Sequence, residues 1–183
     1  MKIAINGFGR IGRLVYRLMK EDDFFDVVAI NDLSSSEEMA YLLRYDTNHR
    51  TYDKDITFDS EGIIVDGKKT RVYSEMDPSN LPWGELGIDL VFECTGKFTK
   101  KEDANKHILA GAKKVLISAP GKGDMKTIVY NVNDDILTSD DIIVSAASCT
   151  TNCLAPIVKV LDDNFGIERG FMTTIHAYTN DQV

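Results

Sequence analysis

The sequence predicts an α/β protein with an open, mostly parallel sheet and flanking helices, followed by the start of a second domain of α+β type. Short apolar runs typical of buried strands alternate with amphipathic helical patterns over residues 1–148. The runs at 2–6 and 25–31 enclose a helical stretch at 10–20, and such a βαβ unit pairs its strands in parallel. The 183 residues are 43% hydrophobic and 27% charged, which leaves enough apolar side chains for a sizeable core.

Each element of residues 1–148 follows from a local pattern. Ser35 and Glu38 fit a capping box that starts a helix after Asp32, and this helix is expected to end near Tyr45. Asp66-Gly67 is a strong signal for a two-residue hairpin turn. The expected strands lie at 2–6, 25–31, 56–58, 63–65, 69–73, 90–93, 115–118, 127–130 and 142–145, and the expected helices at 10–20, 35–45 and 100–110.

The last section of the chain changes character. A run of small and hydroxylated residues precedes an apolar pattern that predicts a long buried helix starting close to Cys149. Pro156 is expected in or just past its first turn, and Gly166 is expected to end it. Residues 170–176 predict one further strand.

A single helix and a single strand cannot form a core of their own. We therefore expect residues 1–148 to form the first domain and residues 149–183 to be the beginning of a second, truncated one. The chain is expected to be part of a longer protein.

Charge and cysteine content narrow the class of protein. The formal net charge of -8 argues against nucleic-acid or anionic-membrane partners, which are bound through dense positive charge. The apolar run at the N-terminus is too short for a signal peptide, and no stretch approaches a membrane span. Three cysteines, an odd number in a chain of this size, favour a reducing compartment. We expect a soluble cytoplasmic protein.

The segment from Gly7 to Gly12 reads G-x-G-x-x-G and lies between the first strand and the first helix. Gly7 permits a tight turn, Gly9 leaves room for a pyrophosphate, and Gly12 lets the helix pack on the strand. Asp32, at the end of the second strand, is placed to bind the ribose hydroxyls of an adenosine and to repel the extra phosphate of NADP. The pattern predicts a Rossmann-type site for NAD. The alternatives are a glycine-rich turn without a ligand and, for Asp32, a helix cap.

Cys149 is expected at the N-terminus of a helix, where the helix dipole and free N–H groups stabilise a thiolate. His176 closes the following strand, so helix and strand can fold back and bring the imidazole to the thiol as a nucleophile and its base. Taken singly, Cys149 could be a buried small residue and His176 a structural histidine.

Cys153, four residues after Cys149, could form a metal pair or a redox disulfide with it, but no second Cys/His pair completes a metal site. Cys94 is expected in the core. His49 and His107 receive no role, and His107 is expected on a helix surface.

Six segments together resemble the glyceraldehyde-3-phosphate dehydrogenase family, over the whole of this chain. They are INGFGRIGR at 5–13, NDL at 31–33, ECTG at 93–96, SAP at 118–120, ASCTTNCLAP at 147–156 and TIHAYT at 174–179. The family's enzymes continue for nearly as many residues again and act as homotetramers. The resemblance therefore implies that further substrate- and nicotinamide-binding residues lie beyond this chain.

The resemblance implies the phosphorylating oxidation of glyceraldehyde 3-phosphate to 1,3-bisphosphoglycerate with NAD in glycolysis. Cys149 would form a thiohemiacetal and then a thioester that inorganic phosphate cleaves, with His176 as the base. By the same carry-over, Ser148, Thr150 and Thr179 bind the substrate phosphate and the attacking phosphate. Residues 149–183 would then begin the catalytic domain.

For the cofactor, the resemblance places the backbone N–H groups of Arg10 and Ile11 at the pyrophosphate and Asp32 at the adenosine ribose. The backbone carbonyl of Met76 would lie at the adenine, and Ser118 near the nicotinamide half. Two other functions stay open at this point. One is a related dehydrogenase such as the erythrose-4-phosphate enzyme, and the other is a dinucleotide-binding module without catalysis.

Overall fold

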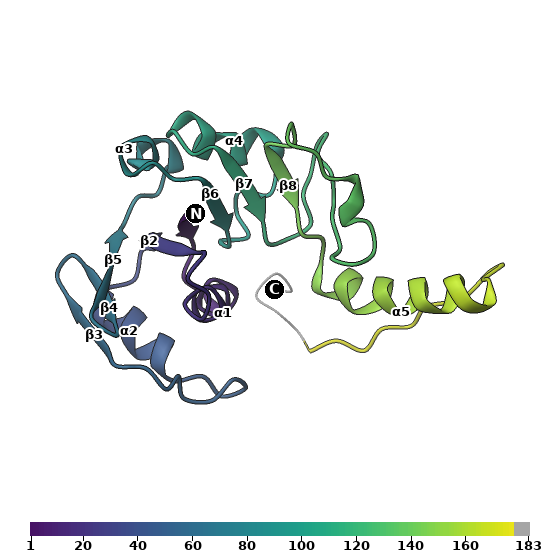
Figure 1. Ribbon diagram of the computed structural model, residues 1–183, viewed down its shortest axis with the longest axis horizontal. Coiled ribbons are helices and arrows are strands. Elements are labelled where there is room, and N and C mark those ends of the chain that lie inside the picture. Colours follow the sequence, from purple (N-terminus) through teal and green to yellow (C-terminus); the bar gives the residue numbers. More distant parts are fainter. Residues whose placement is uncertain (178–183) are drawn as a thin grey trace.

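The computed structural model describes residues 1–177, and it confirms the α/β class with one eight-stranded, mostly parallel sheet (Figure 1). The strands are β1 (Lys2–Asn6), β2 (Asp26–Asn31), β3 (Ile56–Asp59), β4 (Gly62–Val65), β5 (Lys68–Tyr73), β6 (Leu90–Glu93), β7 (Lys114–Ile117) and β8 (Ile143–Ser145). The helices are α1 (Arg10–Met19), α2 (Ser36–Arg44), α3 (Trp83–Leu86), α4 (Lys101–Leu109) and α5 (Cys149–Phe165), with short 3-10 turns at Pro78–Asn80 and Asp134–Ile136.

The order of the strands across the sheet is β3-β4-β5-β2-β1-β6-β7-β8. Across the sheet, neighbouring strands pair in parallel from β5 through β2, β1, β6 and β7 to β8. At the other edge, β4 pairs antiparallel with both β3 and β5. After β1 the chain first builds the β2 side and then crosses to β6, so the direction of winding reverses between β1 and β6. In open α/β sheets a ligand binds at this switch point, outside the carboxyl ends of the strands.

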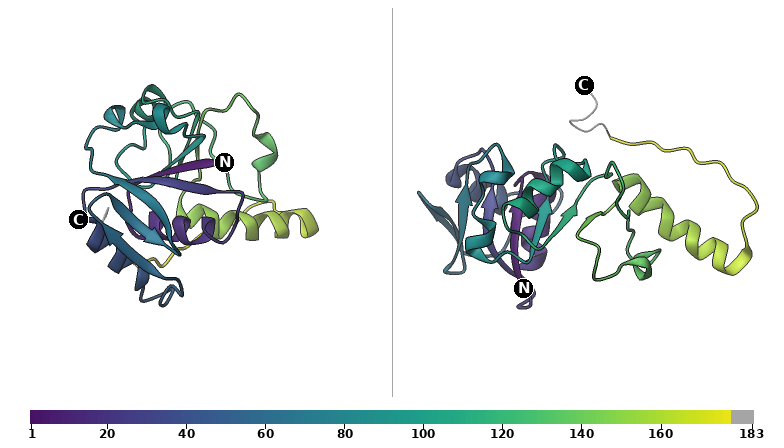
Figure 2. Two further views of the ribbon diagram at one scale, coloured as in Figure 1. Left: turned by 60° about the vertical axis from the view of Figure 1, so that its left-hand side comes forward. Right: turned by 90° about the horizontal axis from the view of Figure 1, so that it is seen from above.

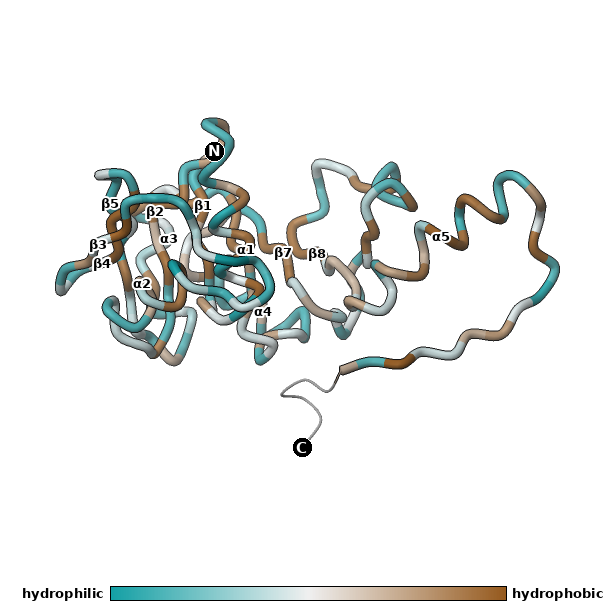
Figure 3. The backbone as a smooth tube through the Cα atoms, turned by 90° about the horizontal axis from the view of Figure 1, so that it is seen from below, coloured by the Kyte–Doolittle hydropathy of each residue, from teal (hydrophilic) through white to brown (hydrophobic). Residues whose placement is uncertain are grey.

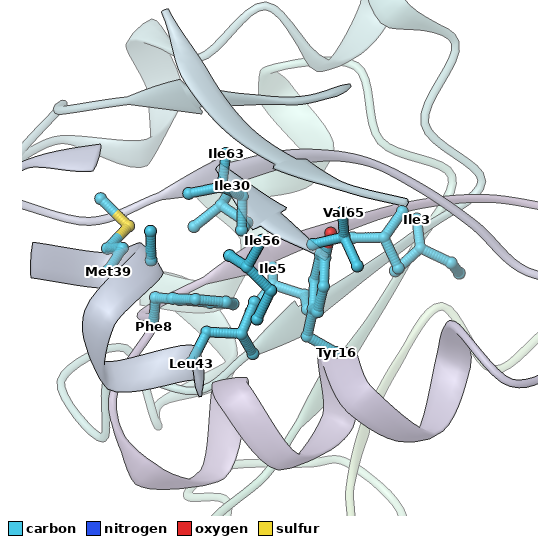
Figure 4. Packing of buried hydrophobic residues seen from close by; sticks show 12 residues of the cluster. Ile3, Ile5, Phe8, Tyr16, Ile30, Met39, Leu43, Ile56, Ile63 and Val65 are labelled. Atoms are coloured by element: carbon cyan, nitrogen blue, oxygen red, sulfur yellow. The ribbon is translucent and has the colours of Figure 1, made fainter. Parts of the chain in front are cut away.

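Helices cover both faces of the sheet because side chains of β1 alternate between two cores. Ile3 and Ile5 point into the core under α1 and α2, and Ala4 points into the core under α3 and α4. Figure 4 shows the first core, in which Tyr16 of α1 packs edge-to-face on Phe8 with 5.5 Å between ring centroids. All of these side chains are buried.

The local signals for turns and caps are confirmed. Ser35 caps α2, and its hydroxyl accepts a hydrogen bond from the backbone N–H of Glu38 at 3.2 Å. Asp66 and Gly67 have φ angles of 50° and 76°, and they join β4 to β5 as an antiparallel hairpin. Both φ angles are positive, as the primed turns of hairpins require.

Two expected strands are not formed. In the 127–130 segment, Thr127 makes a single parallel bridge to Ser145, residues 128–129 are irregular, and a turn begins at Tyr130. Residues 170–176 have strand composition but run from the end of α5 back toward its start without sheet pairing to any described residue (Figure 2). A strand is stabilised by the neighbour to which it hydrogen-bonds, and composition does not supply that neighbour.

The expectation of a buried last helix is wrong. α5 starts at Cys149 and ends before Gly166 as predicted, but its residues are exposed or partly exposed. Apolar stretches of α5 are visible along the tube where it leaves the sheet (Figure 3). Pro156 lies at the eighth position of the helix, well past the first turn.

None of the helices in residues 1–177 has the length and apolar character needed to cross a bilayer.

The packing of the first core predicts that two helical leucines contribute very differently to the free energy of unfolding. Leu43 of α2 is fully buried in the first core, whereas Leu18 of α1 is 73% exposed. Replacing Leu43 with alanine should lower the free energy of unfolding by about 3 kcal/mol, because it leaves a cavity. Leu18→Ala, the matched control, should change it by less than about 0.5 kcal/mol. Urea unfolding measures both, and equal losses would contradict this description of the core.

Candidate active site

The glycine-rich turn joins β1 to α1 at the switch point of the sheet. Gly7 has a φ of +92°, and its N–H donates to the carbonyl of Asn31 at 2.8 Å. A Cβ on Gly7 would lie 2.7 Å from the backbone N of Thr95, and one on Gly12 would lie 2.1 Å from the carbonyl oxygen of Gly7. Glycine is therefore required at both positions for close packing of backbone.

Gly9 is different. Its φ is -69°, which any residue adopts, and a Cβ there would meet no described atom within 4 Å. The chain's own packing gives no reason for glycine, whereas a bound pyrophosphate would. α1 begins just after Gly9, and its first turn, from Arg10 to Arg13, carries no carboxylate to neutralise the free N–H groups. Such a helix start favours an anion.

Asp32 lies at the end of β2 and faces this turn. One carboxylate oxygen accepts from the N–H of Phe8 at 2.6 Å, and the other accepts from the N–H of Ser34 at 2.9 Å. The cap of α2 is Ser35, so Asp32 is not a helix cap. Each carboxylate oxygen keeps a free lone pair for a further donor, such as a ribose hydroxyl.

A cavity of about 290 Å³ opens at the same edge of the sheet. The residues that line it are Asn6, Gly7, Gly9, Asn31, Asp32, Leu33, Glu75, Met76, Cys94, Thr95 and Lys97. Four of the predicted cofactor residues, Gly7, Gly9, Asp32 and Met76, are among them. The cavity, the start of α1, which favours an anion, and the Asp32 carboxylate, which can accept from a ribose, together fit a dinucleotide.

The other predicted cofactor residues lie around this cavity rather than in its wall. Arg10 and Ile11 form the first turn of α1, and Gly12 packs beneath the turn. Ser118 follows β7, and its N–H donates to the carbonyl of Glu93 at 3.0 Å. Their roles toward the cofactor stay predictions.

The start of α5 is held by a set of local hydrogen bonds. Ser148 is the N-cap, and its hydroxyl accepts from the N–H of Thr151 at 3.0 Å. The side chain of Asn152 donates to the carbonyls of Ala146 and Ser148 at 2.7 and 2.9 Å. Ala147 has a φ of 62°, an unfavourable angle for a residue with a Cβ, and such strain is frequent at functional sites. These constraints aim the first turn of the helix.

Cys149 is exposed at the first position of α5, and its Sγ lies 3.3 Å from Nε2 of His176. This contact holds the pKa of Cys149 below that of an ordinary thiol, and the backbone N–H of Thr150 lowers it further. The pKa of His176 is raised, first by the bond from Nδ1 to the carbonyl of Ala177 at 2.5 Å and then by Cys149. Because a carbonyl accepts the Nδ1 proton, Nε2 is the atom that exchanges a proton with the sulfur.

The remaining predicted residues are placed as follows. Ser148 and Thr150 lie beside Cys149, half-buried at the start of α5, and Thr179 lies outside the described residues. Cys153 is an exposed free thiol one turn further along. Cys94 is half-buried in the cavity wall, and burial raises the pKa of its thiol to about 12, which makes it a poor nucleophile. Within residues 1–177, no group of three or more metal-ligating side chains gathers.

One buried feature, the pair of His107 and Glu93, does not follow from the sequence patterns. His107 was expected on a helix surface, but its side chain is fully buried against Glu93 of β6, with 2.9 Å between Nε2 and the carboxylate. A signal was present, because Ala104 and His107 are three residues apart and share one face of α4.

Residues 1–101 match the family model described as "Glyceraldehyde 3-phosphate dehydrogenase, NAD binding domain", and residues 148–183 match the model of its C-terminal domain. The chain belongs to the glyceraldehyde-3-phosphate dehydrogenase family. Its first part is the NAD-binding domain, which confirms NAD as the cofactor predicted from the turn and Asp32.

Several members of the glyceraldehyde-3-phosphate dehydrogenase family are similar over the whole chain. The enzyme of Clostridium pasteurianum is 58% identical over 181 residues, covering 99% of this chain and 54% of its own length. Glyceraldehyde-3-phosphate dehydrogenase 2 of Bacillus subtilis is 56% identical over 183 residues, and the enzyme of Chlamydia pneumoniae is 55% identical over 185. Both comparisons cover all of this chain, with 54% and 55% of those relatives' lengths. The chain thus spans about half the length of the relatives it matches.

The surroundings of Gly9 and Gly12 predict that an alanine substitution lowers NAD affinity at Gly9 and stability at Gly12. Gly12→Ala forces a Cβ against the carbonyl of Gly7 and should cost about 2 kcal/mol of stability, because the packed turn cannot expand freely. Gly9→Ala should cost less than about 1 kcal/mol but weaken NAD binding at least about tenfold, because the methyl group occupies the open approach to the turn. Urea unfolding and calorimetric titration with NAD separate the two. Undiminished NAD affinity in Gly9→Ala would contradict this placement of the pyrophosphate.

Proposed function

We propose that the full-length protein catalyses the NAD-dependent, phosphorylating oxidation of D-glyceraldehyde 3-phosphate to 1,3-bisphosphoglycerate, a step of glycolysis. The observation that supports it most directly is the contact between Cys149 and His176 at the start of α5 in a chain with an NAD-binding domain. The names of the relatives support the same reaction.

In this reaction the Cys149 thiolate attacks the aldehyde carbon, forming an S–C bond and an alkoxide. The lowered pKa of Cys149 favours the thiolate, and the raised pKa of His176 favours a proton on Nε2 beside it. The backbone N–H of Cys149, in the first turn of α5, and Nε2 of His176 are proposed to donate to the oxygen as it becomes negative. Ser148, Thr150 and Thr179 are proposed to bind the phosphate groups.

The proton of Nε2 passes to the alkoxide, which gives the thiohemiacetal hydroxyl, and the neutral Nε2 takes this proton back as the hydride leaves. NAD, when bound, supplies the acceptor for the hydride that leaves the same carbon. Inorganic phosphate attacks the resulting thioester, the S–C bond breaks, and the Cys149 thiolate is regenerated. The low pKa of this thiol also makes it a good leaving group in that last step.

The proposal extends to the organisation of the whole protein. Residues 1–148 would carry the cofactor, with Arg10, Ile11, Met76 and Ser118 in the roles expected from the resemblance. Residues 149–183 would begin the catalytic domain. The full-length protein would be cytoplasmic and would form a homotetramer. Light scattering of the purified protein tests the oligomeric state.

Activity of the full-length protein should require the thiol of Cys149. NADH, followed by its absorbance, should form when glyceraldehyde 3-phosphate, phosphate and NAD are all present. Cys149→Ser should lower kcat more than about a thousandfold, because a hydroxyl is a far weaker nucleophile at neutral pH. Cys153→Ser, one turn further along α5, is the matched control and should retain activity. NAD binding without turnover in the wild type would favour a binding module, and preferential turnover of erythrose 4-phosphate would favour the related dehydrogenase.

The contact with His176 predicts the pH dependence of alkylation at Cys149. Iodoacetamide reacts with the thiolate, so the midpoint of the rate against pH should lie below the ordinary thiol value of about 8.5. His176→Asn should move this midpoint upward, because it removes the imidazole that stabilises the thiolate. A Cys153→Ser background and mass spectrometry of the Cys149 peptide isolate the signal. The same midpoint with and without His176 would refute the pairing.

A further inference from the structure

A row of buried polar side chains crosses the sheet beneath the cavity that Asp32 and the glycine-rich turn line. It runs from Trp83 of α3 through His107 of α4 and Glu93 of β6 to Asn6 of β1 and Asn31 of β2. Each member is at most 5% exposed. None of them is needed for the chemistry at Cys149, so a buried carboxylate at the switch point of the sheet requires another explanation.

Glu93 accepts from four donors. One oxygen accepts from Asn6 Nδ2 at 2.6 Å and lies 2.9 Å from His107 Nε2. The other accepts from the backbone N–H of Thr95 at 2.8 Å and from the Thr95 hydroxyl. With two donors at each oxygen, the Glu93 carboxylate acts only as an acceptor.

The proton of His107 is fixed by Trp83. The indole Nε1–H donates to His107 Nδ1 at 3.0 Å, and an indole nitrogen can only donate. Nδ1 is therefore the acceptor of this bond, and Nε2–H donates to Glu93. The 3.4 Å separation between Asn6 Nδ2 and His107 Nε2 is the distance between two donors that share one oxygen.

The direction of each further hydrogen bond follows because the Glu93 oxygens only accept. Asn6 must turn its amide nitrogen to Glu93, so its oxygen accepts from Asn31 Nδ2 at 2.7 Å. The oxygen of Asn31 then accepts from the N–H of Glu75 at 2.8 Å, and its nitrogen also donates to the carbonyl of Glu75 at 2.9 Å. Asn6, Asn31, Glu75 and Thr95 all line the cavity.

We propose that Glu93, oriented by His107, is a positioning residue for NAD: it fixes Asn6, Asn31 and the Thr95 loop before the cofactor arrives. The wall of the cavity is then pre-organised, and binding does not have to order it. This inference rests on NAD as the cofactor of the cavity, and it concerns the affinity for NAD rather than the chemical step.

Glu93→Gln in the full-length protein is the first test. The amide of Gln must direct its NH₂ either at the Thr95 N–H or at the Asn6 and His107 donors, so a donor is forced to turn away on one side. We expect the Kd for NAD, measured by calorimetry, and the KM for NAD to rise about tenfold or more. The kcat at saturating NAD should stay within about threefold, because the wall contacts ground state and transition state alike.

Two substitutions of His107 supply a rescue test that does not depend on the folding of Glu93→Gln. His107→Leu removes both the donor to Glu93 and the acceptor for Trp83, and it should raise the Kd for NAD about fivefold or more. His107→Gln offers an amide N–H and a carbonyl oxygen in their place and should remain within about twofold of the wild type.

Thr70→Val is the matched structural control. The Thr70 side chain is fully buried, donates to the carbonyl of Val27 at 3.1 Å and contacts the Tyr16 hydroxyl. Thr70 does not belong to the residues that line the cavity. This variant should lose stability in urea but keep the wild-type Kd for NAD.

If Glu93→Gln and His107→Leu lose stability but bind NAD as the wild type does, the row is merely structural and the inference is overturned. Failure of the wild type itself to bind NAD would instead overturn the assignment of the cofactor.

Discussion

The parallel pairing of β1 with β2 on one side and β6 on the other is the constraint on which the rest of the structure depends. Parallel strands bring their carboxyl ends to one edge, so the glycine-rich turn, Asp32 and the loop containing Thr95 meet there although they are far apart in sequence. Gly7 must pack against the backbone of Thr95 for this to happen. The buried Glu93 carboxylate occupies the same junction and links the strand ends by hydrogen bonds.

Local patterns predicted most of the first domain because its elements are specified by local chemistry. The cap at Ser35 and the turn at Asp66-Gly67 each depend on a few neighbouring residues, and both are as expected. The strand expected at 170–176 depends on a pairing partner, which composition cannot provide. The apolar pattern of α5 likewise predicts a buried helix although the helix is exposed, because hydrophobicity indicates a face that can pack but not what packs on it.

The candidate site divides in the same way. The G-x-G-x-x-G turn and Asp32 could be found from the sequence because their spacing along a βαβ unit is diagnostic, and the contact between Cys149 and His176 was expected from the chain's order. Glu93 and His107 could not be paired from the sequence, since their elements meet through the sheet. Four hydrogen-bond donors stabilise the Glu93 carboxylate in its buried position, and these donors come from three separate segments of the chain.

A crystal structure of the full-length protein with NAD tests the proposed cofactor site most directly. We expect the pyrophosphate over Gly9 at the start of α1, the adenosine ribose hydroxyls on the Asp32 carboxylate, and Asn6 and Asn31 in the same orientation as in the free protein. A dinucleotide bound elsewhere, or an Asn6 side chain that turns away from Glu93 when NAD is bound, would contradict the proposed site.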